Sequence, residues 1–127
     1  MSGNGRLDGL RVLIVEDEAL ILMAEEDIVQ ELGCALFGST ARLSEALSMV
    51  RDELPDVAVL DINLGDEKSY PLAKYLLARG VPVVFATGDK SVAGPWHDVP
   101  ICRKPFNKSS FAAAILAALE TPLHQNG

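Results

Sequence analysis

Short, mainly apolar runs alternate along this chain with stretches whose apolar residues recur at helical spacing. The runs at residues 11–15, 57–60 and 81–86 consist mainly of Val, Leu, Ile, Phe and Ala. Apolar runs without polar alternation are typical of strands covered on both faces, as in a parallel sheet. The helical stretches between them supply the crossovers that parallel strands need. This order predicts an α/β domain with a parallel sheet and right-handed connections.

The boundaries of the elements follow from turn and cap residues. The helical stretches end at Gly33, Pro55 and Gly80. Asn107 is expected to cap a last helix. Residues 88–99 show no helical stripe, so the fourth helix should be short or irregular. The predicted strands are residues 11–15, 34–38, 57–60, 81–86 and 99–102, and the inward face of the last helix holds Phe111, Ile115, Ala118 and Leu119.

Length and charge bound the classes of function. A chain of 127 residues has room for about one domain, which we place at residues 8–120 between flexible ends at 1–7 and 121–127. No apolar run is long enough for a membrane span, and the N-terminus lacks a signal peptide, which favours a cytoplasmic protein. A net charge of −7 without a basic stripe disfavours nucleic acid and anionic membranes as partners, so a protein partner is favoured. Cys34 and Cys102 lie in apolar runs and predict buried free thiols.

Polar residues follow the predicted strands where each strand ends. Glu16 and Asp17 follow the first strand, Asp61 the third, Thr87 the fourth, and Lys104 lies just after the fifth. Open α/β sheets bind ligands at the carboxyl ends of their strands, so these side chains should meet in one crevice. Carboxylates brought that close repel one another unless a divalent cation lies among them, and oxygen ligands suit Mg²⁺. The chemistry implied is phosphoryl transfer.

Four segments in order carry a family resemblance: VLIVEDE at 12–18, VAVLD with INLGDE at 57–67, FATG at 85–88 and KPF at 104–106. Together they resemble the receiver domains of two-component response regulators over nearly the whole chain. The FATG segment, followed by a glycine-containing loop, is similar to the stand-alone FAT GUY receivers, which are associated with HWE-type histidine kinases. The resemblance implies a flavodoxin-like (βα)₅ fold with a doubly wound five-stranded sheet in the order 2-1-3-4-5.

The resemblance also implies roles for the site residues. Asp61 would accept a phosphoryl group, with Mg²⁺, or Mn²⁺ in its place, held by Glu16, Asp17, Asp61 and the backbone carbonyl of Asn63. Glu16 would act through a metal-bound water or reach the metal itself. Phosphoryl oxygens would be bound by the hydroxyl of Thr87, the amide of Gly88 and the ammonium of Lys104. The peptide bond between Lys104 and Pro105 should be cis, and Asn63 and Asp89 should tune the lifetime of the aspartyl phosphate.

The implied partner is a sensor histidine kinase, possibly HWE-type, or a histidine phosphotransfer protein. A stand-alone receiver would signal through phosphorylation-dependent protein–protein contacts, with a phosphorylation-dependent dimer among the options. It would not be an enzyme beyond its own phosphorylation and dephosphorylation. The downstream target and the choice between switch, relay and phosphate sink stay open.

One position departs from the family pattern. Most receivers carry an aromatic residue three positions before the lysine, and its rotation accompanies movement of the hydroxyl residue. Ile101 occupies that position here. We therefore expect phosphorylation to act instead by ordering residues 88–99 and drawing Thr87 inward.

Three other functions compete with this one. A receiver that never takes phosphate would serve as a constitutive docking module. A small Mg²⁺-dependent phosphohydrolase of the haloacid dehalogenase type would carry its nucleophile after the first strand and an acid two residues later, whereas Asp61 follows the third strand and Asn63 cannot act as an acid or base. A flavodoxin-like cofactor binder would need a glycine-rich phosphate loop where Glu16 and Asp17 stand.

Overall fold

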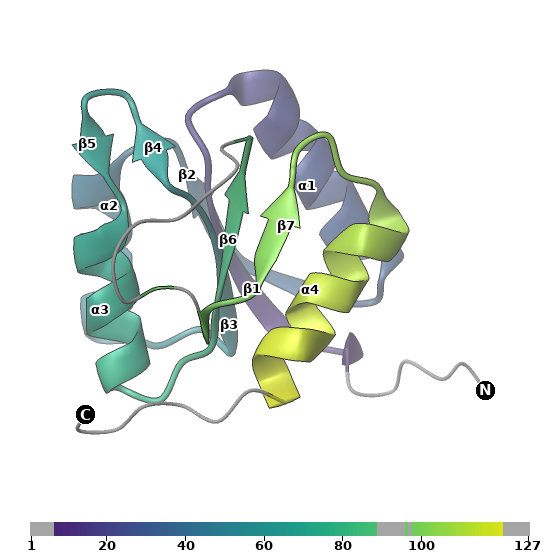
Figure 1. Ribbon diagram of the computed structural model, residues 1–127. Helices are drawn as coiled ribbons and strands as arrows, with labels where there is room; N and C mark the ends of the chain where they lie inside the picture. The colour runs from purple at the N-terminus through teal and green to yellow at the C-terminus, as the bar shows by residue number, and fades with distance from the viewer. Residues whose placement is uncertain (1–6, 89–95, 97, 121–127) are drawn as a thin grey trace.

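A five-stranded parallel sheet organises the part of the chain that the computed structural model describes, residues 7–88, 96 and 98–120. Its strands lie in the order β2-β1-β3-β6-β7 (Figure 1), and every adjacent pair is parallel. This arrangement confirms the predicted strand order and the flavodoxin-like fold. The strands are β1 (Arg11–Val15), β2 (Ala35–Thr40), β3 (Val57–Asp61), β6 (Val83–Thr87) and β7 (Ile101–Arg103).

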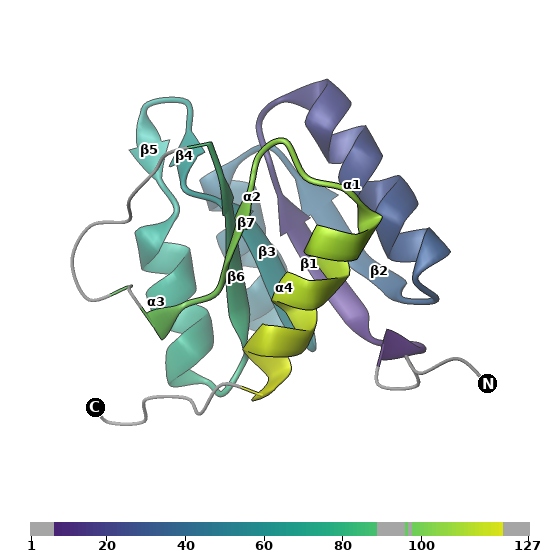
Figure 2. The ribbon, with the colours of Figure 1, turned by 45° about the vertical axis from the view of Figure 1, so that its right-hand side comes forward.

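Helices cover both faces of the sheet. Helices α1 (Ala19–Glu31) and α4 (Lys108–Glu120) lie on one face, and α2 (Leu43–Asp52) and α3 (Tyr70–Ala78) on the other (Figures 1 and 2). Alternate residues of β1 enter two cores: Val12 and Ile14 face α1 and α4, while Leu13 and Val15 face α2 and α3. Burial of each such side chain contributes about 1.5–3 kcal/mol. The inner strands therefore read as unbroken apolar runs in the sequence.

The sequence predicts a loop at residues 63–68, but this segment after β3 is more regular in the structure. It forms a short antiparallel hairpin of β4 (Asn63–Leu64) and β5 (Glu67–Lys68), with Asn63 directly opposite Lys68. Gly65 makes the turn with φ +63°, a backbone conformation that only glycine adopts at little cost. The hairpin therefore adds a small second sheet above the main one.

The exposed and buried faces of α1 also differ from the simplest reading of its apolar spacing. Leu20 is 81% exposed and Ala24 is exposed, whereas Glu25 and Val29 are the buried residues of this helix. Leu20 and Ala24 instead line a groove beside the loop after β7. The helical spacing of these apolar residues predicts one inward stripe, which places two groove residues with the core. The stripe consists of Leu20, Ile21, Ala24, Ile28 and Leu32.

The start of α4 agrees with prediction. The Asn107 Oδ1 atom accepts the N–H of Ser110 at 2.8 Å, and the Ser110 hydroxyl accepts the N–H of Asn107 at 3.0 Å, a reciprocal cap. Cys34 and Cys102 are buried free thiols, also as expected. Residues 1–6, most of 89–97 and 121–127 lie outside the described residues, and with them the expected flexible ends and the predicted irregular fourth helix.

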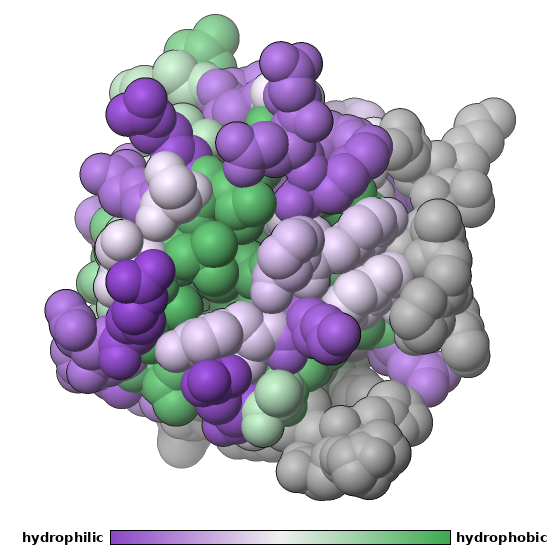
Figure 3. Space-filling view, turned by 90° about the vertical axis from the view of Figure 1, so that its left-hand side faces the viewer, coloured by the Kyte–Doolittle hydropathy of each residue, from purple (hydrophilic) through white to green (hydrophobic). Residues whose placement is uncertain are grey.

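On the side of the molecule that carries α2 and α3, some hydrophobic side chains of the core are partly exposed to solvent. Figure 3 shows hydrophobic side chains gathered there between polar ones. Leu43, Leu47, Leu54 and Tyr75 are partly buried and pack on the core of this face. In the part of the chain that the structure describes, no helix combines the length and the hydrophobicity that a membrane span requires.

Candidate functional site

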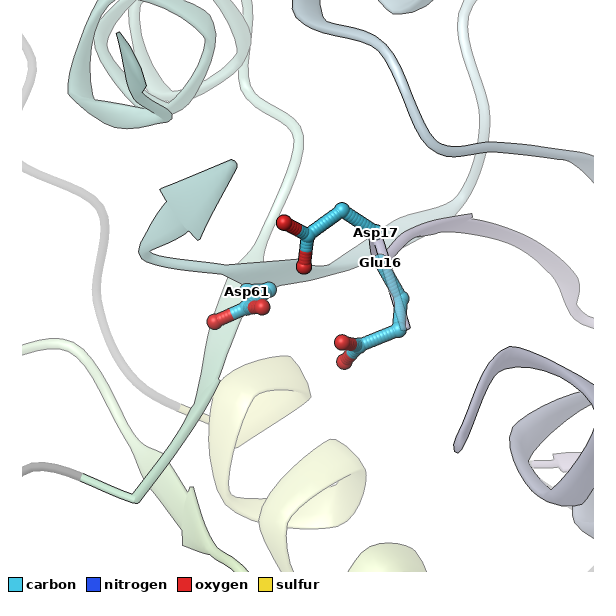
Figure 4. A group of neighbouring side chains, drawn as sticks. All are labelled: Glu16, Asp17 and Asp61. Carbon is cyan, nitrogen blue, oxygen red and sulfur yellow. The ribbon is translucent and has the colours of Figure 1, made fainter. Parts of the chain in front are cut away.

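Three carboxylates converge at the carboxyl edge of the sheet. Glu16 and Asp17 directly follow β1, and Asp61 ends the neighbouring parallel strand β3, so the two strands deliver their acids to one place. One oxygen from each lies within 4.8 Å of the other two. Figure 4 shows Asp17, Asp61 and Glu16 around a shared space. The convergence predicted from the strand ends is therefore present for these three residues.

Lys104 joins the three acids from the far end of β7. Its Nζ atom lies 2.9 Å from Glu16 Oε1, 3.2 Å from Glu16 Oε2 and 3.4 Å from Asp61 Oδ2. Its backbone N–H donates to the carbonyl of Thr87 at 3.0 Å, which ties the residue after β7 to the end of β6. The Lys104–Pro105 peptide bond is cis, as the resemblance implied.

The surroundings change the proton affinities of two site residues. Burial, together with the negative charge of Glu16, raises the pKa of Asp61 to about 7, although the Lys104 ammonium lowers it. For Lys104, burial lowers the pKa, but the hydrogen bond with Glu16 and the charges of Asp61 and Glu16 raise it above its usual value. Lys104 therefore keeps its positive charge at neutral pH. The ionised form of Asp61 is less favourable than that of an exposed aspartate.

A pocket of about 290 Å³ opens above these groups. Glu16 lies beneath it, fully buried, while Thr87 is 1% exposed at its wall. The Asn63 N–H donates to Asp61 Oδ1 at 3.3 Å, and its side-chain oxygen accepts a hydrogen bond from Lys68. Asp89 lies outside the described residues. The pocket is lined by Asp17, Glu18, Asp61, Asn63, Gly65, Thr87, Gly88 and Lys104.

Backbone hydrogen bonds hold the acidic side chains in place. The Gly65 N–H in the hairpin turn donates to Asp17 Oδ2 at 2.9 Å. The N–H of Glu16 donates to the carbonyl of Thr40 at 3.0 Å, and the N–H of Glu18 donates to Glu16 Oε2 at 3.2 Å. The acidic residues are thus fixed by two neighbouring segments, β2 and the β4–β5 hairpin.

The donor set fits a hard divalent cation. Carboxylate oxygens are the ligands that Mg²⁺ prefers, and three acids this close otherwise repel. Glu16 is the deepest of the three and is already paired with Lys104. Asp17 is exposed and Asp61 borders the pocket, so these two carboxylates face the space that an ion would occupy.

The sequence reasoning missed a fourth acid near the site. Glu25 of α1 is 1% exposed, and its Oε1 atom has no hydrogen-bond partner among the described residues. Burial, and then the charge of Glu16, raises the pKa of Glu25 to about 9. Its spacing from Ile21 and Ile28, four and three residues away, was the available signal, because it puts Glu25 on an apolar helical stripe.

An apolar groove borders the site on the side of α1. It has a volume of about 470 Å³ and reaches Lys104 at one end. Its walls are the first turns of α1 and the loop that follows β7. The lining residues are Glu18, Leu20, Ile21, Ala24, Lys104, Pro105 and Phe106.

Comparisons with known proteins agree with this geometry. The family model described as the response regulator receiver domain matches residues 12–95. The solution structure of SdrG from Sphingomonas melonis Fr1 is 43% identical, with a TM-score of 0.79 over 87% of this chain and 96% of that one. The BeF₃-activated conformation of SdrG from Pseudomonas melonis Fr1 is 42% identical, with a TM-score of 0.76 over 88% of this chain and 98% of that one.

A longer curated protein is also similar. The phyllosphere-induced regulator PhyR of Methylorubrum extorquens is 31% identical over 114 residues, which is 85% of this chain and 43% of that protein. This chain spans less than half the length of the curated relatives it matches. The receiver motifs, the strand order and the acidic pocket together place the chain in a known family: it belongs to the response regulator receiver domains.

Proposed function

We propose that this protein accepts a phosphoryl group on Asp61 from a phosphohistidine of a partner protein, in a Mg²⁺-dependent reaction, and signals through protein contacts that depend on this phosphorylation. The observation that carries the proposal is the position of Asp61. It borders an open pocket, with two other carboxylates in reach and the Lys104 ammonium 3.4 Å away. An acceptor, a cation and a set of metal ligands are thereby supplied by one site.

The transfer is a single displacement at phosphorus. An oxygen of Asp61 attacks the phosphorus, the P–N bond to the donor histidine breaks, and its electron pair stays on the imidazole nitrogen. A carboxylate is a weak nucleophile, so the site must act by positioning and by neutralising charge. Lys104, the Thr87 hydroxyl and the Gly88 amide would bind phosphoryl oxygens, because all three residues line the pocket.

Asp17, Asp61, the carbonyl of Asn63 and, directly or through water, Glu16 would hold the metal. Bound Mg²⁺, or Mn²⁺ in its place, supplies positive charge that offsets repulsion between the carboxylates and the incoming phosphoryl group. Before a metal ion binds, Lys104 forms ion pairs with Asp61 and Glu16. Asn63 and Asp89 would set the lifetime of the aspartyl phosphate through access of water.

The donor would dock along the apolar groove between α1 and the loop after β7. Leu20 and Met23 are 81% and 58% exposed on α1, and the groove reaches Lys104. A sensor histidine kinase or a histidine phosphotransfer protein could place its histidine over Asp61 from this groove. The FATG segment at 85–88 supports a FAT GUY receiver and an HWE-type kinase. The likeness to SdrG, of which this chain covers 96%, supports a stand-alone receiver. The receiver would act in the cytoplasm without a separate enzymatic activity.

The test is the phosphoryl adduct itself. The purified protein is incubated with acetyl phosphate and Mg²⁺, and intact mass is followed, with a phosphorylated histidine kinase as a second donor. We expect one phosphoryl group per chain. It should not form when a chelator is added before the donor, and it should be absent in Asp61→Asn. Asp66→Asn, an exposed acid in the same hairpin, is the matched control and should be labelled like the wild type.

Labelling that survives in Asp61→Asn would reject Asp61 as the acceptor. The absence of labelling from both donors would favour the constitutive docking module. Repeated turnover of a phosphomonoester would favour the phosphohydrolase.

A further inference from the structure

Three aromatic rings meet beside the end of β6. Tyr70 of α3 and Trp96 are stacked, with ring centroids 5.2 Å apart and planes 7° from parallel. Phe85 of β6 packs edge-to-face with both, its ring centroid 5.8 Å from that of Tyr70 and 5.7 Å from that of Trp96, with interplanar angles of 85° and 81°. These are the stacked and edge-to-face geometries that aromatic pairs favour.

The cluster lies where this chain lacks an aromatic residue on β7. Ile101 is the direct strand partner of Phe85, and it packs on the same core as Tyr70 and Trp96. The aromatic surface next to Phe85 is thus supplied by α3 and by Trp96, not by the last strand. Neither Tyr70 nor Trp96 lines the pocket above Asp61.

Two of the rings are mechanically connected to the phosphoacceptor site. Phe85 and Thr87 are two residues apart on β6, so their side chains point to the same face of the sheet. The Phe85 N–H donates to the carbonyl of Pro100, and the Lys104 N–H donates to the carbonyl of Thr87, each at 3.0 Å. These two hydrogen bonds tie the end of β6 to the residues on either side of β7.

Trp96 belongs to the same unit, because the Val99 N–H donates to its carbonyl at 3.0 Å just before β7. Tyr70 belongs to another, since it begins α3, which is anchored in the core by Leu72, Ala73 and Leu76. The Tyr70–Trp96 stack is thus a contact between two units. One unit consists of β6, β7 and Trp96, and the other is helix α3.

We propose that the Tyr70–Trp96 stack is the conformational latch of this receiver, closed in the unphosphorylated protein and opened when Asp61 is phosphorylated. The proposal rests on the function proposed above. Thr87 and Lys104 would follow the phosphoryl oxygens toward Asp61, and the ends of β6 and β7 would carry Trp96 away from Tyr70. Stacking of two rings requires a small range of distances and angles, so such a displacement breaks the stack. The buried residues of α3 would keep their packing in the core.

Trp96 is the one tryptophan of the chain, so its fluorescence reports the stack directly. Emission and acrylamide quenching are measured with and without Mg²⁺ and beryllofluoride, and again with acetyl phosphate while intact mass is followed. We expect occupancy of Asp61 to shift the emission to longer wavelength and to steepen the quenching. Asp61→Asn should show neither change.

Two substitutions separate the latch from the acceptor. Tyr70→Phe keeps a ring that can stack and should respond like the wild type. Tyr70→Leu removes the stack, so its unphosphorylated form should already show the long-wavelength emission and should change little on phosphorylation, while the phosphoryl adduct still forms. If circular dichroism shows that Tyr70→Leu is unfolded, the wild type and Tyr70→Phe decide the question.

The outcomes distinguish the two proposals. A phosphoryl adduct on Asp61 without a change in emission and quenching, or with reduced quenching, overturns the latch and leaves the acceptor function standing. If no adduct forms with acetyl phosphate or a kinase and beryllofluoride does not bind, the latch is overturned together with the function on which it rests.

Discussion

Glu25 is a carboxylic acid placed where a folded protein seldom puts a charge. It is 1% exposed on the inner face of α1, one of its oxygens has no hydrogen-bond partner among the described residues, and Glu16 and Asp61 add negative charge nearby. The positive charge of Lys104 acts in the opposite direction and lowers the pKa of Glu25. A buried acid of this kind holds its proton, because the neutral form avoids the cost of an unpaired buried charge.

The first prediction concerns the pH dependence of stability. The pKa of Glu25 is raised from 4.5 to about 9 in the folded protein, so the folded state binds a proton that the unfolded state releases between these values. Its contribution to stability is then fully present below pH 4.5 and is lost as pH rises through about 9. Each pH unit inside this window should cost about 1 kcal/mol of unfolding free energy.

Glu25→Gln has no proton to lose and should remove this slope. We expect the variant to gain stability over the wild type progressively from pH 5 to pH 8, measured by urea unfolding with a chelator present. Glu31→Gln, an exposed acid on the same helix, is the control and should leave the slope unchanged. Parallel curves for wild type and Glu25→Gln would show that Glu25 is ionised in the folded protein.

Among the elements, the β4–β5 hairpin does more than connect β3 to α3. Its turn donates the Gly65 N–H to Asp17, and its first residue donates an N–H to Asp61. The hairpin thus positions two of the three carboxylates. Sequence reasoning gave this segment as a loop because two-residue strands carry no periodicity to detect.

The second prediction tests this positioning. Gly65→Ala forces an alanine into φ +63°, at a cost of about 1 kcal/mol, with no clash because an added Cβ has open space. The strain should shift the turn away from Asp17 and weaken Mg²⁺ binding, by up to about five-fold if all of this free energy is lost from binding. Unfolding free energy and Mg²⁺ affinity are measured by urea titration and calorimetry.

Gly9→Ala is the matched control, because Gly9 has φ +73° and equally open space but lies at the opposite end of β1. It should lose similar stability and keep its Mg²⁺ affinity. An equal loss of affinity in both variants would mean that the effect is one of general stability, not of the hairpin.

For the molecule as a whole, the sheet could be predicted further than the helix faces. Apolar runs predicted the strands, and the family resemblance implied their order in the sheet. The polar residue after each run predicted the convergence of Asp17, Asp61 and Lys104. A residue at the carboxyl end of a strand lies at the carboxyl edge of the sheet, because the carboxyl ends of parallel strands meet at that edge. Rotation of a helix is set by its packing partners instead, so the exposure of Leu20 could not be read from spacing alone.

The same limit applies to contacts between distant segments. The stack of Tyr70 on Trp96 joins residues of two elements that no motif links. The stack depends on how α3 packs against the residues just before β7, and this packing is set by the tertiary structure. Ile101 indicated that an aromatic residue was missing from β7, without indicating where its replacement came from.

The last prediction follows from a site built by several strands at once. The pocket takes residues from the ends of β1, β3 and β6 and from beyond β7, so unfolding of the chain destroys it and a ligand bound there stabilises the whole fold. Ligand at about one hundred times its dissociation constant contributes about 2.7 kcal/mol. For a domain of this size that is a rise in Tm of about 10 °C. Mg²⁺ and beryllofluoride together should produce it in a thermal melt, whereas Mg²⁺ alone should give a smaller rise and beryllofluoride alone should give none. Asp17→Asn and Asp61→Asn should abolish the rise, whereas Asp66→Asn, outside the pocket, should keep it. An equal rise in all three variants would place the ligands on the acidic surface of a chain with net charge −7 and not between the strands.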